Sequence, residues 1–171
     1  MRIIFCIIVL ALLLQGCGKK AGEKIAEKMI ESAAARDGVK ADVKISDDSL
    51  TIKTDKGQTI YSAGKSAKIP DNFPRDIYVY GDANVVAALT HPEGFSIVME
   101  TKDSQEKVYN TIKTKFNESG WNEAMTMSQK GAKILTYTKE NKTVNIMITE
   151  EKKGSQINMT VALDKKIEKD E

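Results

Sequence analysis

Cysteine, histidine and aromatic residues are scarce in this chain of 171 residues. It holds 2 cysteines, 1 histidine and 1 tryptophan, and aromatic residues make up 6% of it. So few ligands cannot complete a zinc site built from His and Cys. No serine lies in the strand–turn–helix context of a nucleophile elbow, and glycine-rich phosphate loops are absent. We therefore expect a protein that is not an enzyme and that carries no cofactor.

The charges are nearly balanced, with 26 Lys and Arg against 24 Asp and Glu and a formal net charge of +2. No stripe of basic residues interleaved with aromatic residues is present, which is the pattern that nucleic-acid binding requires. The sequence therefore excludes nucleic acid as the expected partner, and it predicts no strong field of either sign.

The long hydrophobic run of the chain lies at its start, from Ile3 to Leu14, after Met1 and Arg2. As a helix this run would rise roughly 18 Å, whereas a bilayer core of about 30 Å needs roughly 20 residues. A short basic start, an apolar middle and small residues at the end are typical of a secretory signal peptide. We predict that residues 1–16 are this signal peptide.

The residues Leu14-Gln15-Gly16-Cys17 resemble the lipobox of bacterial lipoproteins. The resemblance implies cleavage between Gly16 and Cys17, with a diacylglyceryl thioether and an N-acyl group such as palmitate on Cys17, which then holds the protein to a membrane. Several acyl chains give stable anchoring. Because Gly18 is not the Asp that retains such proteins at the inner membrane, the resemblance implies an outer-membrane protein facing the periplasm, if the organism has two membranes. Cys6 would leave with the signal peptide, so the mature chain would have neither free thiol nor disulfide.

Residues 17–38 are predicted to hold the lipid anchor and an amphipathic helix over about 21–36, which ends at Asp37-Gly38. Its apolar face consists of Ile25, Ala26, Met29, Ile30 and Ala33. Two placements stay open: the helix packs on the rest of the protein, or it lies on the membrane beside the lipid. Lysines favour the membrane placement (Lys19, Lys20, Lys24, Lys28), and glutamates oppose it (Glu23, Glu27, Glu31). We expect packing.

From residue 39 the hydrophobic period changes to two, and turn residues at 47–48 and 55–57 divide residues 39–63 into a three-stranded β meander. A linker follows over residues 64–76, containing Pro70 and Pro74. Its Pro-x-x-Phe-Pro stretch resembles a segment that precedes a C-terminal α+β domain in uncharacterised bacterial lipoproteins.

Residues 77–163 are predicted to form an α+β domain of two strands, one helix and four strands, followed by a charged tail at 164–171. Asp103 and Glu106 predict a capping box at the start of the helix, and Gly120 predicts its end. The helix would bury Val108, Tyr109, Ile112 and Phe116. The fold class is thus α+β: an amphipathic helix and a meander, then a mainly antiparallel sheet with one packed helix.

One constellation points to a metal. Trp121, Met125 and Met127 alternate on a predicted strand, which would place them on one face together with Glu123. Thioethers select Cu(I) and an indole can cover a cation, although methionine is also an ordinary core residue. His91 is predicted to be a surface residue of the His91–Gly94 turn.

A membrane-anchored domain without catalytic groups acts by contact. We predict a binding or scaffold module of the cell envelope that contacts another envelope protein through a strand edge or the polar face of its sheet. The alternative is a periplasmic carrier with an apolar pocket for a lipid or small ligand. A cell-wall hydrolase with paired carboxylates and the Cu(I)-binding protein are weaker alternatives.

Overall fold

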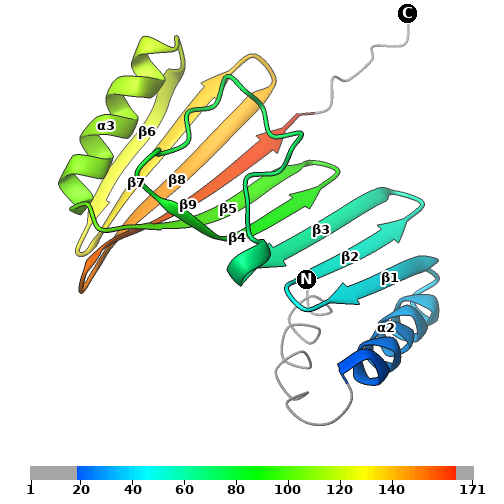
Figure 1. The fold of residues 1–171 in the computed structure, drawn as a ribbon. Coiled ribbons are helices and arrows are strands. Elements are labelled where there is room, and N and C mark those ends of the chain that lie inside the picture. The colour runs from blue at the N-terminus through cyan, green and yellow to red at the C-terminus, as the bar shows by residue number, and fades with distance from the viewer. Residues whose placement is uncertain (1–18, 165–171) are drawn as a thin grey trace, which may run out of the picture.

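The computed structural model describes residues 19–164 and confirms the α+β fold class (Figure 1). The elements are α2 (Lys19–Arg36), β1 (Ala41–Ser46), β2 (Ser49–Thr54), β3 (Gly57–Ala63), the 3-10 turn η2 (Gly64–Ser66), β4 (Asn84–His91), β5 (Gly94–Thr101), α3 (Gln105–Glu118), β6 (Asn122–Gln129), β7 (Ala132–Lys139), β8 (Lys142–Glu151) and β9 (Gly154–Leu163). Within this part of the chain, neither helix is long and apolar enough to cross a membrane. The predicted signal peptide, Gly16, Cys17 and all but the first residue of the charged tail lie outside the described residues.

All the described strands belong to one antiparallel sheet of nine strands, in the order β1-β2-β3-β4-β5-β9-β8-β7-β6. The predicted meander is therefore not a separate layer. It joins the C-terminal strands where β3 pairs with β4, over the four residue pairs from Ile60–Thr90 to Ala63–Ala87. As Figure 1 shows, β1 lies at one end of the sheet and β6 at the other.

One face of the sheet, here called the inner face, carries the main core. Alternate residues of β5, β7, β8 and β9 point to it, and most are buried completely, as the period of two requires. The core residues of these four strands are Phe95, Ile97, Met99, Leu135, Tyr137, Val144, Ile146, Ile148, Ile157, Met159 and Val161.

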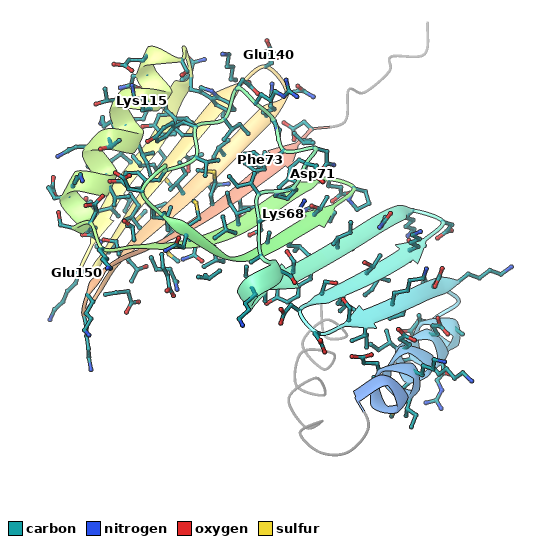
Figure 2. All side chains as sticks on the ribbon, viewed as in Figure 1. Lys68, Asp71, Phe73, Lys115, Glu140 and Glu150 are labelled. Carbon is teal, nitrogen blue, oxygen red and sulfur yellow. The ribbon has the colours of Figure 1, made fainter. Side chains whose placement is uncertain are left out.

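Helix α3 covers only part of this face, with Val108, Ile112 and Phe116 fully buried. Residues 67–83, here called the cover segment, supply the rest on the same side (Figure 1). Its Phe73 ring packs edge-on against Phe95, with 5.3 Å between the ring centroids, and Ile77 and Tyr80 are buried. Figure 2 labels Phe73 on this segment, close to Lys68 and Asp71, which form an exposed ion pair. The stretch predicted as a linker therefore contributes to the core.

The ends of α3 show one error and one success of the sequence prediction. Ser104, not Asp103, is the N-cap, because its hydroxyl accepts from the amide of Lys107. At the other end the predicted stop at Gly120 is confirmed: the Trp121 amide donates to Phe116 O at 3.1 Å and the two rings pack edge-on. This is the hydrogen bond and hydrophobic contact of a Schellman motif.

Helix α2 packs along β1, as expected, and covers the end of the sheet. Glu31 Oε1 accepts from the amide of Val43 at 3.1 Å, and Glu27 Oε1 accepts from the amide of Ile45 at 2.8 Å. These amides belong to the edge of β1 that no strand pairs with in the described residues. Two glutamates thereby cap an edge that would otherwise be open to pairing with another chain.

Candidate functional site

Aromatic side chains gather between α3 and the inner face of the sheet. The ring of Phe116 stacks on Tyr137 at a centroid distance of 4.5 Å and meets Trp121 edge-on at 5.4 Å. Phe116 and Tyr137 are fully buried and Trp121 nearly so. Offset and edge-on contacts of this kind stabilise a core beyond the area that they bury. We call Phe116, Trp121 and Tyr137 the aromatic cluster.

The hydroxyl of Tyr137 is the polar group of this cluster that lacks a hydrogen bond. It is buried, and the described residues offer it no hydrogen-bond partner. Burial raises the pKa of this phenol to about 12, with a further contribution from the charge of Glu123. The hydroxyl therefore stays protonated at physiological pH. A buried polar group without a partner requires an explanation, such as a bound water or ligand.

The cover segment is tied to the aromatic cluster and to the start of α3. Trp121 Nε1 donates to the carbonyl oxygen of Asp76 at 3.1 Å. Tyr80 Oη donates to Asp103 Oδ2 at 2.6 Å, and Lys107 Nζ donates to Asp103 Oδ1 at 2.8 Å. The hydrogen bonds from Lys107 and then Tyr80 lower the pKa of Asp103, so its carboxylate is held ionised. Asp103, expected as a helix cap, instead fastens the cover segment.

Ion pairs join α3 to β6 and β7. Lys113 Nζ lies 3.0 Å from Glu123 Oε2 on β6, and Lys133 on β7 pairs with Glu106. Lys133 Nζ also lies 4.4 Å from the centroid of the Tyr109 ring, within cation–π range. Hydrogen bonds from Thr126 and then Lys113 lower the pKa of Glu123. A lowered pKa is the opposite of what a general acid of a glycoside hydrolase needs.

The structure does not bring the three candidate copper ligands together. A β-bulge between Glu123 and Met125 shifts the register of β6 against β7. Trp121 therefore points into the inner core, whereas Met125 and Met127 lie on the outer face and are 42% and 38% exposed. The prediction of a shared face was wrong because one extra residue reverses the alternation. Among the described residues, no group of three or more His, Cys, Asp or Glu side chains is placed to hold a metal ion.

The outer face instead carries a methionine patch that the sequence analysis missed. Met127 and Met147 flank Ile134 across three neighbouring strands, and Met125 lies two residues from Met127. Met147 is 41% exposed. His91, expected in a surface turn, ends β4 and accepts a hydrogen bond from the amide of Glu93 through Nδ1 at 3.3 Å.

The two ends of the sheet differ. The β1 edge is capped by α2, whereas nothing in the described part of the chain pairs with the outer edge of β6. Every residue of β6 is exposed. The hydrogen-bonding groups of its free edge are therefore available to another strand.

Comparison with known proteins gives one family match. Residues 85–157 match the model of the START domain-like family. The matched region runs from β4 into β9, so it contains α3 and the aromatic cluster, and it covers less than half of the 171 residues. No curated protein and no solved structure matches the chain significantly. The match favours a fold that binds a lipid or another apolar ligand, which is compatible with the carrier alternative.

Proposed function

We propose that this chain is a lipid-anchored protein of the cell envelope that binds an apolar ligand, such as a lipid, between α3 and the inner face of its sheet. The observation that carries the proposal is the unpartnered hydroxyl of Tyr137 within the aromatic cluster. The START domain-like match over the same elements supports it. The anchor is the expected lipid on Cys17. No catalytic step is part of this function.

The energetics of Tyr137 favour a ligand with one polar group. Leaving a buried hydroxyl without a partner costs about 1–3 kcal/mol. An acyl chain with a carbonyl or carboxylate could lie along Phe116 and Trp121 and accept the hydrogen bond from Tyr137. Apolar pockets with a few polar groups that fix orientation are the usual form of small-molecule sites.

Entry of such a ligand requires the cover segment to move, because side chains occupy the space between α3 and the sheet. Side-chain contacts hold the segment: Phe73 against Phe95, Trp121 Nε1 to Asp76 O, and Tyr80 to Asp103. An ion pair between Lys142 and Asp76 and a hydrogen bond from Thr101 to Asp82 O hold it as well, so opening must break these too. A ligand that contacts only the open state would shift the population toward it. Phe73, Ile77 and Tyr80 would then occupy the ligand's place in the closed state.

The test compares Tyr137→Phe with Tyr109→Phe in the full chain purified from its own cells. Tyr109 lies on the flank of α3 with its ring under Lys133, so it is a matched control outside the cluster. Noncovalent lipid is extracted and quantified by mass spectrometry against the protein. We expect about one lipid per wild-type chain. Tyr137→Phe should carry several-fold less lipid, and Tyr109→Phe should carry as much lipid as the wild type. Equal lipid in all three proteins would reject the proposal, and Tyr137→Phe should then be neutral or stabilising in urea unfolding.

A second function is favoured by the open edge of β6. We propose that an extended segment of another envelope protein adds to this edge as a further strand, with the methionine patch beside it. Strand addition gives affinity through main-chain hydrogen bonds, and flexible methionine side chains suit varied partners. The contrast with the capped β1 edge supports this assignment, because within residues 19–164 only the β1 edge of the sheet is capped.

The variants Thr126→Pro and Thr126→Val test the edge. The two-residue turn between Gln129 and Ala132 closes the hairpin, so the alternation points the Thr126 amide away from β7. Proline removes that amide, whereas valine keeps it. A photoreactive residue at Ser128 should capture a defined envelope protein in cells. Proline should abolish the capture and valine should preserve it, with unchanged circular dichroism. Capture that survives proline would rule out strand addition.

A further inference from the structure

Charges are segregated around α2. Each of its acidic residues (Glu23, Glu27 and Glu31) is half-buried on the side that faces β1. Glu27 and Glu31 accept hydrogen bonds from β1 amides, so their charge is directed into the protein. The basic residues of the helix from position 22 onward, Lys24, Lys28 and Arg36, are exposed, and Lys24 and Lys28 border the stripe of glutamates.

The outward side of the helix exposes two large apolar residues. Ile25 is 62% and Met29 is 54% exposed, the two highest values among the exposed large hydrophobic residues of the described chain. They lie four residues apart, so their side chains are neighbours on one stripe of the helix. Ala26 and Ile30, expected on the same apolar face, are turned toward the sheet and half-buried. Packing on β1 therefore uses two of the five residues expected on the apolar face and leaves Ile25, Met29 and Ala33 exposed.

We propose that this outward side of α2, formed by Lys24, Ile25, Lys28, Met29 and Arg36, lies on an anionic lipid bilayer. The apolar pair would enter the boundary between headgroups and acyl chains, and the three cations would bind lipid phosphates. Helices that lie in a membrane interface typically carry an apolar stripe beside Lys and Arg residues. Anionic lipid headgroups attract these cations. This goes beyond the proposed ligand site and does not depend on it.

Three glutamates on the helix would oppose a membrane placement if their charges faced the bilayer. All three are half-buried instead, and Glu27 and Glu31 bond to the edge of β1. Packing on the protein and contact with the membrane are therefore compatible, through opposite sides of one helix. The helix begins at Lys19, two residues after the expected lipid site at Cys17, so the anchor would hold it at the bilayer surface.

Site-specific photo-cross-linking in vesicles tests the placement. The full chain, with a photoreactive residue replacing Met29 or Asn110, is purified from its own cells. Asn110 is an exposed residue of α3, so it is the matched helical control. The protein is reconstituted into vesicles of phosphatidylglycerol and phosphatidylethanolamine, or of phosphatidylcholine alone. We expect lipid adducts at position 29 roughly tenfold above those at position 110 in the anionic vesicles, and a several-fold decrease in phosphatidylcholine.

Charge variants separate electrostatic attraction from mere proximity to the anchor. Lys24→Glu with Lys28→Glu should lower the adduct at position 29 about tenfold. The control, Lys152→Glu with Lys153→Glu in the exposed β8–β9 turn, makes the same change of charge and should leave the adduct unchanged. Equal adducts at positions 29 and 110, an adduct indifferent to both charge variants, or capture of a second copy of the chain at position 29 would each overturn the proposal.

Discussion

Replacing Phe116 by alanine should lower the free energy of unfolding by about 3–5 kcal/mol, a large part of the roughly 5–15 kcal/mol that holds a domain folded. Phe116 is fully buried at the centre of the aromatic cluster, stacked on Tyr137 and edge-on to Trp121. Its ring also packs on Trp121, which directly follows the helix stop at Gly120. The surrounding strands cannot collapse onto the gap, because their backbones are fixed by the sheet.

Urea unfolding, followed by the fluorescence of Trp121, measures this change directly, because this tryptophan is the only one in the sequence. Asn110→Ala on the exposed side of α3 is the control and should shift stability by no more than about 0.5 kcal/mol. A loss below about 1.5 kcal/mol for Phe116→Ala would mean that neighbouring side chains refill the space, which would contradict the rigid packing described here.

Replacing Gly94 by alanine should be similarly severe and should cost at least about 3 kcal/mol. Gly94 begins β5 with a φ of +150°, and a Cβ atom there would lie 1.9 Å from the carbonyl oxygen of Val161 on β9. The overlap is with backbone, so it can be relieved only by separating β5 from β9 at the middle of the sheet.

Two other glycines separate the cost of the steric overlap from the cost of the positive φ. Gly131 has a φ of +78° but open space around its Cβ position, so alanine there should cost only the unfavourable conformation, about 1–2 kcal/mol. Gly81 has open space and no such φ, so alanine should be close to neutral. We expect the midpoint urea concentration to be lowest for the Gly94→Ala variant, higher for Gly131→Ala and highest for Gly81→Ala. A Gly94 variant as stable as the Gly131 variant would contradict the steric argument.

Much of the fold could be predicted from the sequence, because local signals carry it. The change of hydrophobic period at residue 39 and the turn residues between strands located the strands, and the apolar spacing of Val108, Ile112 and Phe116 located α3. The pairing of β3 with β4 could not be predicted, because 20 residues (64–83) separate the two strands and no local signal marks the pairing.

The error about the copper ligands has a different cause, because their shared face depends on a single register shift. Trp121, Glu123, Met125 and Met127 alternate without interruption in the sequence, and the bulge that divides them leaves no mark on that pattern. Tyr137 also looked like an ordinary strand residue. Its importance comes from the lack of a hydrogen-bond partner, which only the assembled core reveals.

The width of the sheet fixes the distance between its two edge strands, β1 and β6. The order from β1 to β6 contains eight strand-to-strand steps, each of about 4.8 Å, so the two edges lie up to roughly 40 Å apart. If α2 lies on a bilayer as proposed, the protein would act as a spacer: it would hold the β6 edge away from the lipid headgroups, where the proposed partner strand could reach it without approaching the membrane.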